Sequence, residues 1–197
     1  AASGAVDEDA LLKTAETLFS DFTANGAGPA RTAPQFQGGL LHDPRKIEQT
    51  HLAVAFPGVA SGHEDYFATR LYADVLGGGM SSRLFQEIRE KRGLVYSVYS
   101  FSSHYVDGGL FSIYAGTGAN DIGELMPVMC DELVRATEDL SEEEVTRARA
   151  QLKASVVMAM ESNSGRCETL ARQIQIFGRP QTMEEIVAKI DAVDLES

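Results

Sequence analysis

Arg89 and Tyr96 are the two side chains in this sequence best suited to holding a polar ligand. They lie seven positions apart, and Lys91-Arg92-Gly93 between them marks a change from a helical to a β-rich pattern. A guanidinium carries a fixed positive charge with several donors, and a phenol adds one hydroxyl. If the helix end folds against the strand, both groups can reach one peptide carbonyl or developing oxyanion. The same spacing also fits a solvated cation at a helix end and a half-buried strand aromatic.

One stretch, Gly77 to Ser100, predicts the elements that carry these two residues. It has the sequence GGGMSSRLFQEIREKRGLVYSVYS. The glycines at its start end a preceding helix, Ser81 or Ser82 can cap the next helix, and Gly93 releases the backbone into a β-rich run. The guanidinium is therefore expected near a helix end and the phenol on a strand.

The rest of the sequence alternates strand and helix patterns. Residues 50–56 have apolar positions with a period of two, which predicts a mostly buried strand. The β-rich runs 94–104 and 110–116 flank a turn and predict an antiparallel hairpin. Apolar stripes predict core-facing helices over 7–23, 64–76, 120–137, 141–161 and 164–177, and Thr182 can cap a last helix that reaches residue 190. The expected fold is α+β, a mainly antiparallel curved sheet with helices packed on one face.

Three local signals refine this outline. Ser141 and Glu144 have the spacing of a capping box at the start of a long helix. Asp107-Gly108 supplies the positive backbone angles that a tight hairpin needs. Glycines and prolines between residues 25 and 44 predict an extended connection before the first strand.

Composition excludes several classes of function. Of 197 residues, 29 are acidic and 17 basic, and the formal charge of −12 opposes contact with nucleic-acid phosphates and anionic membranes. No run reaches the length of a membrane span, and the first residues lack the pattern of a signal peptide. Cys130 and Cys167 lack zinc-ligand spacing and are predicted to be buried thiols. The sequence is expected to form a soluble globular domain that binds no nucleic acid.

The stretch from Gly77 to Ser100, continued through Tyr105 to Phe111, resembles a family of zinc metallopeptidases. It is similar to the carboxy-terminal-half domain of enzymes related to mitochondrial processing peptidase, pitrilysin and insulin-degrading enzyme, above all the bacterial processing-peptidase-like members. Subunits of these members have two domains of similar fold, the first carrying the metal and the second closing over the substrate. By this resemblance, Arg89 and Tyr96 match a paired Arg and Tyr that hold the substrate backbone beside the scissile bond.

The zinc motif of that family is inverted, His-x-x-Glu-His, with a further acidic ligand downstream. None of the four histidines here has a partner at that spacing: they are His42, His51, His63 and His104. His51 is interpreted as a strand side chain. The resemblance implies zinc in the full-length enzyme, bound by an amino-terminal half or a partner chain, and none bound by this chain.

The resemblance also implies the organisation of the whole protein. Residues 1–197 are expected to form a single domain, the second, non-zinc half of a two-domain subunit, truncated at both ends. Its expected role is to bind substrate and complete the active site of a zinc-dependent endopeptidase acting on unfolded or presequence-like peptides. The expected partners are the peptide, the zinc-binding half and a second subunit in a homodimer or heterodimer. A bacterial cytoplasm or periplasm is the expected compartment.

Two other classes of function remain open. One is a non-catalytic relative, such as the core subunits of a respiratory complex, that keeps the fold as an assembly scaffold. The other is a stand-alone peptide-binding module, which fits poorly with ends that resemble an interrupted strand and an interrupted helix. The joint presence of Arg89 and Tyr96 favours peptide handling over a scaffold.

Overall fold

The computed structural model describes residues 1–23 and 32–195. Every helix and strand predicted from sequence is present, with bounds shifted by a few residues. The elements are α1 (Glu8–Phe19), β1 (Thr50–Gly58), α2 (Tyr66–Gly77), η1 (Phe85–Glu90), β2 (Val95–His104), β3 (Gly109–Thr117), α3 (Ile122–Glu138), α4 (Glu142–Glu161), α5 (Asn163–Phe177) and α6 (Met183–Asp191).

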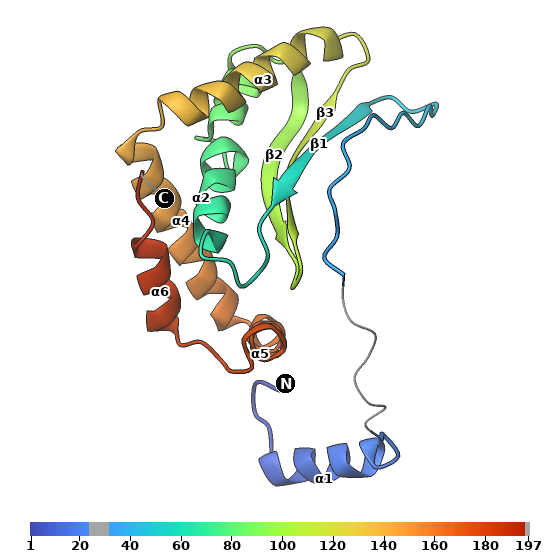
Figure 1. Cartoon of the computed structure of the whole chain (residues 1–197), viewed down its shortest axis with the longest axis vertical. Coiled ribbons are helices and arrows are strands. Elements are labelled where there is room, and N and C mark those ends of the chain that lie inside the picture. The colour runs from blue at the N-terminus through green and yellow to red at the C-terminus, as the bar shows by residue number, and fades with distance from the viewer. Residues whose placement is uncertain (24–31, 196–197) are drawn as a thin grey trace.

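The three strands form one antiparallel sheet in the order β1-β3-β2. β3 pairs along its length with both neighbours, with Thr50 of β1 opposite Thr117 and His104 of β2 opposite Gly109. The sheet curves, and the helices α2 to α6 lie on one side of it (Figure 1). The α+β fold with a curved antiparallel sheet and helices on one face is therefore confirmed.

β1 is an edge strand that buries one face. Leu52 and Val54 pack against the core, whereas His51, Ala53 and Ala55 on the opposite face are exposed. The prediction of a mostly buried strand was wrong, because no described element covers the face of β1 that carries these three residues. Alternation with a period of two is what a strand with one solvated face requires.

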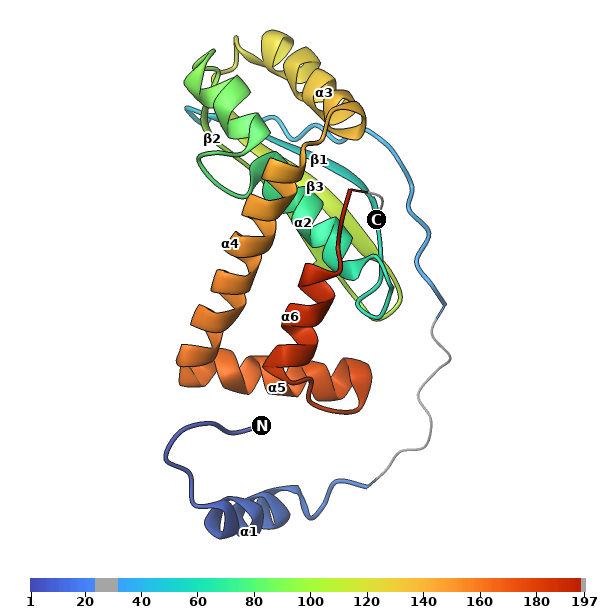
Figure 2. The same cartoon turned by 90° about the vertical axis from the view of Figure 1, so that its left-hand side faces the viewer.

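α2 is the central helix, with apolar clusters on both of its sides. Ala73 and Leu76 pack toward the sheet, η1 and α3. Leu71 on the other side packs with Leu152 of α4 and Ile190 of α6. α2 therefore lies between the sheet and the pair α4 and α6, which gives three layers (Figure 1); seen from the helix side, α4 and α6 lie in front of α2 (Figure 2). Burying each leucine-sized side chain stabilises this stack by roughly 2 kcal/mol.

The turn of the β2-β3 hairpin is closed by a backbone hydrogen bond from Tyr105 N to Gly108 O, at 2.8 Å. The pairing of β2 with β3 confirms the predicted hairpin. The predicted positive backbone angles are wrong, because Gly108 has no positive φ. The following glycine, Gly109, is needed for packing instead. A Cβ at this position would overlap the carbonyl oxygen of Val59.

α1 lies apart from the three layers (Figure 1) and buries none of its side chains. Leu18 is 69% exposed and Phe19 is 60% exposed. The predicted core-facing side of this helix was wrong, because none of the described elements covers it. Part of the predicted connection, residues 24–31, lies outside the described residues, and 32–49 form neither helix nor strand.

Two further predictions of burial fail on the outer helices. Cys130 on α3 is exposed, and Cys167 on α5 is half-buried with its Sγ donating to Ala1 O at 2.9 Å. α5 buries Gln173, while Ile174 is half exposed. Both errors have one cause: apolar spacing defines a stripe on a helix but not whether another element lies against it.

Candidate functional site

A short helix over residues 83–90 carries the first candidate residue. It begins as an α-helical turn and continues as the π-helical η1, after which Lys91 N donates to Gln86 O at 3.0 Å. Leu84 and Ile88 are fully buried and anchor it beside β2 and α3. Single π-helical turns are rare and are frequent at functional sites.

The predicted serine cap of this helix is not formed. Ser82 precedes the helix and its carbonyl oxygen accepts from Gln86 N at 3.0 Å, but its Oγ donates backward to Gly79 O at 2.6 Å and caps no backbone N–H. The helix is instead held by its buried apolar side chains and by ion pairs at its two ends.

Arg89 projects from this helix into solvent. Its Cζ lies 4.8 Å from the centroid of the Phe85 ring, one turn earlier, in a cation–π contact. No carboxylate lies within ion-pair distance of this guanidinium in residues 1–23 and 32–195. The ring lies against the guanidinium itself, and the N–H donors of that group stay available for a ligand.

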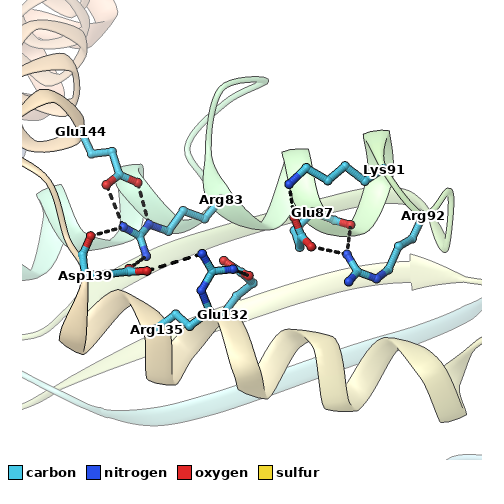
Figure 3. Close-up of polar contacts among 8 residues, drawn as sticks. All are labelled: Arg83, Glu87, Lys91, Arg92, Glu132, Arg135, Asp139 and Glu144. Atoms are coloured by element: carbon cyan, nitrogen blue, oxygen red, sulfur yellow. Dashed lines mark hydrogen bonds and ion pairs between the residues drawn. The ribbon is translucent and has the colours of Figure 1, made fainter.

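The other cations nearby are already paired (Figure 3). Glu87 accepts from Lys91 Nζ at 2.6 Å and also pairs with Arg92 Nη1. These hydrogen bonds, the one from Lys91 first, lower the pKa of Glu87 to about 2. Arg83 is likewise occupied by carboxylates. Arg89 is therefore the one cation between residues 83 and 92 without a carboxylate partner in the described structure.

Arg83 forms a bidentate ion pair. Its Nε and Nη2 donate to the two carboxylate oxygens of Glu144 at 2.6 and 2.7 Å, and it also pairs with Asp139. Glu144 simultaneously accepts from Ser141, which confirms the predicted capping box of α4. The Arg83 hydrogen bond is the main cause that lowers the pKa of Glu144 to about 2. Only 11% of the Arg83 side chain is exposed, so the pair is largely desolvated.

The ion pairs of Arg83 were not predicted from sequence, because its partners Asp139 and Glu144 lie 56 and 61 positions away. The available signal was a cation at a helix start and an acidic run over 138–144 that exceeds the needs of one cap. Spacing along the chain cannot show that two such segments meet.

A tight turn leads from the helix to β2. Gly93 has a φ of 65°, in the left-handed region that favours glycine, and its N–H donates to Arg89 O at 3.1 Å. Leu94 N donates to Ile88 O at 3.1 Å and closes the helix end. The predicted role of Gly93, releasing the backbone into a strand, is confirmed.

Tyr96 occupies a β-bulge immediately after this turn. Val95 lies opposite Thr117 and Ser97 lies opposite Gly116, so Tyr96 is the extra residue on β2. It is 62% exposed. A bulge of this kind re-aims a side chain away from the regular alternation, and bulges are common beside active sites.

The structure thus places both candidate residues at the surface, on the two sides of one turn. Arg89 ends the helix and Tyr96 begins the strand, as the sequence predicts. Neither is sealed in the core. That their donors converge on one ligand stays a prediction.

The solvated face of the sheet carries an aromatic row that sequence analysis did not single out. Tyr99 of β2 stacks on Tyr114 of β3 with ring centroids 5.0 Å apart, and Phe101 lies 5.9 Å from Tyr99. His51 Nδ1 is 2.6 Å from Tyr114 Oη, so the interpretation of His51 as a strand side chain is confirmed. The sequence signal for this row was aromatic residues at every second position of a strand, which places them on one face of the sheet.

The remaining polar candidates lie elsewhere. His104 Nδ1 is 2.8 Å from Val59 O, and burial lowers the pKa of this imidazole. A groove of about 1330 Å³ lies at this far end of β2, lined by Tyr66 and Arg70 among others, and residues 77–101 contribute nothing to its lining. It is therefore separate from Arg89 and Tyr96.

The described residues have neither a metal-ligand cluster nor a membrane-spanning helix. They contain no group of three or more His, Cys, Asp or Glu side chains placed to hold a metal ion. They also contain no helix with the length and apolar character needed to cross a membrane. The residues present therefore do not fit a catalytic zinc ion.

Comparison with known proteins gives consistent matches. The sequence model described as the peptidase M16 inactive domain matches residues 1–152. The chain is 35% identical over 189 residues to the uncharacterized zinc protease YmxG of Bacillus subtilis (strain 168), covering 95% of this chain and 46% of that protein. The chain thus spans about half the length of the curated relatives it matches.

Two solved structures show the same fold. The peptidase M16 inactive domain from Pseudomonas fluorescens superimposes with a TM-score of 0.67 at 28% identity, covering 75% of this chain and 36% of that one. A chain of complex III2 from Candida albicans gives a TM-score of 0.82 at 21% identity, over 97% of this chain and 48% of that one. The second likeness is of fold alone.

Proposed function

The chain belongs to the peptidase M16 inactive domain family, and we propose that it is the half of a zinc-dependent endopeptidase that binds the peptide substrate and completes the active site. The observation that carries this proposal is the free guanidinium of Arg89. Every other cation of residues 83–92 in the described structure is neutralised by a carboxylate.

In this role, Arg89 and Tyr96 act on the backbone of the peptide. The carbonyl oxygen at or beside the scissile bond accepts hydrogen bonds from the guanidinium and from the phenol. When the carbonyl carbon is attacked, negative charge grows on that oxygen and both interactions strengthen. Because the two side chains extend from a helix anchored by buried Leu84 and Ile88 and from a bulged strand, little reorganisation is needed at that moment.

The metal chemistry belongs to another part of the enzyme in this proposal. The described residues offer no ligand set for zinc, and the histidines lack the spacing of the inverted motif. The rest of the full-length protein, or a partner subunit in a homodimer or heterodimer, supplies the metal, the nucleophilic water and the general base. This division accounts for a family member that has donors for a substrate but no metal-ligand cluster among its described residues.

We assign unfolded or presequence-like peptides as the substrates. An extended backbone presents its carbonyl groups to side chains, whereas a folded segment has them paired internally. Donors that read only backbone carry little sequence preference, which suits cleavage of many unfolded chains.

The experiment uses the full-length protein with Arg89→Ala or Tyr96→Phe. Each change is expected to lower kcat/KM on an unfolded peptide by about tenfold or more, with zinc content unchanged. Wild-type kcat/KM in both variants would show that neither side chain acts on the substrate and would favour a scaffold function instead.

A further inference from the structure

Arg83 connects the helix that carries Arg89 to a distant part of the fold. Its guanidinium lies between Glu144, the N3 residue of the α4 capping box, and Asp139, after the end of α3 (Figure 3). It also donates from Nη2 to Asp139 O at 3.0 Å. The start of the helix is therefore fixed to the junction of α3 and α4 by charge-assisted hydrogen bonds.

The other side-chain hydrogen bonds of this helix in the described structure stay local: Gln86 Nε2 donates to Met80 O at 2.6 Å, and Glu87 accepts from Lys91 and Arg92. η1 is π-helical over six residues, with Lys91 N donating to Gln86 O. Leu84 and Ile88 hold it against the core, but apolar contacts leave rotation about the helix axis less restricted than hydrogen bonds do. Arg83 and Arg89 lie on this one segment, so rotation at the first residue moves the second.

The contacts of Arg83 favour a positioning role over that of a charge that only keeps the surface solvated. Arg149 of α4 also pairs with a first-turn acid of that helix, Glu142, and its Nη1 lies 3.5 Å from Asp191 O at the end of α6, so these contacts do not reach residues 83–90. Arg83 is the arginine in the described structure that joins residues 83–90 to α4. It is also more buried than Arg149, at 11% against 20% side-chain exposure.

We infer that Arg83 is a positioning residue for the active site: its pairing with Glu144 and Asp139 sets the orientation of the helix from which Arg89 reaches the substrate. The inference rests on the proposed function of Arg89. It predicts that the effect of Arg83 on catalysis passes through Arg89.

A double-mutant cycle in the full-length protein tests this route. Arg83→Lys keeps the charge and removes the bidentate fork. Because small misplacements of an oriented group are costly, kcat/KM is expected to fall about tenfold, mainly through kcat, with zinc content unchanged. In an Arg89→Ala background, the same change is expected to alter kcat/KM by less than about twofold.

Glu144→Gln repeats the cycle from the other side of the pair and keeps an acceptor for the α4 cap, in case Arg83→Lys does not fold. Arg149→Lys is the matched control, with kcat/KM expected to stay within about twofold of wild type. Losses that multiply in the double variants, or wild-type rates in both Arg83→Lys and Glu144→Gln, would overturn the inference alone. A wild-type rate in Arg89→Ala would instead overturn the proposed function on which it rests.

Discussion

The end of α2 passes so close to β2 that a Cβ at Gly77 would overlap the backbone nitrogen of Ser100. Ser100 Oγ also donates to Ala73 O at 2.7 Å, which ties the strand to the same turn of the helix. Gly78 at the C-cap has a φ of −79°, so α2 does not end in a left-handed residue. Gly77 is therefore required by packing, and its position sets the distance between the central helix and the sheet.

Gly77→Ala is expected to destabilise the chain by about 3 kcal/mol or more, because the helix and strand must separate to admit the methyl group. Gly62→Ala is the control, since a Cβ there meets no atom within 4 Å. Its effect should be within about 1 kcal/mol of zero. Equal stabilities of the two variants in denaturant unfolding would contradict the packing argument.

The Arg83–Glu144 pair predicts a specific pH dependence of stability. In the folded chain Glu144 stays ionised down to about pH 2, whereas its ordinary pKa is 4.5. Between these values unfolding takes up a proton, so the free energy of unfolding falls as the pH falls, by up to about 1.4 kcal/mol per pH unit. Above the ordinary pKa the contribution is fully present.

Glu144→Gln should remove this part of the slope. Denaturant unfolding of both proteins at several pH values between 6 and 3 should show a stability gap that narrows as the pH falls. Glu87, whose pKa is also lowered to about 2, remains in both proteins and contributes equally. A gap that stays constant with pH would show that the pair does not depend on ionised Glu144.

The isolated chain of residues 1–197 is expected to have no peptidase activity when zinc is added. No metal-ligand cluster exists among its described residues, so neither an activated water nor a general base is expected at a zinc ion. Equilibrium dialysis should detect no zinc bound in a one-to-one ratio at micromolar concentration. Zinc-dependent cleavage by the pure chain would refute the division of labour between the two halves.

Local chemistry made much of the fold predictable from sequence. The capping box at Ser141, the turn at Gly93 and the alternation in β2 and β3 each depend on residues within a few positions of one another. The placement of Arg89 at a helix end and Tyr96 on a strand follows from the same signals. Short-range hydrogen bonding and side-chain periodicity are enough to define such elements.

Properties set by distant contacts were not predictable in the same way. The ion pair of Arg83 with Glu144 spans 61 positions, and the bulge at Tyr96 depends on the register with β3. The exposure of α1 and of one face of β1 depends on which elements lie against them. Each of these needs the three-dimensional arrangement, because one sequence pattern is compatible with either a covered or a solvated face.

The most direct test of the account compares two arginines of the same helix end in the full-length protein. Arg89 is free in the described structure, and Arg92 is paired with Glu87. On one unfolded peptide substrate, Arg89→Ala is expected to lower kcat/KM by about tenfold or more, and Arg92→Ala to leave it within about twofold of wild type. Equal losses in the two variants, or no loss in Arg89→Ala, would contradict the claim that this guanidinium holds the substrate.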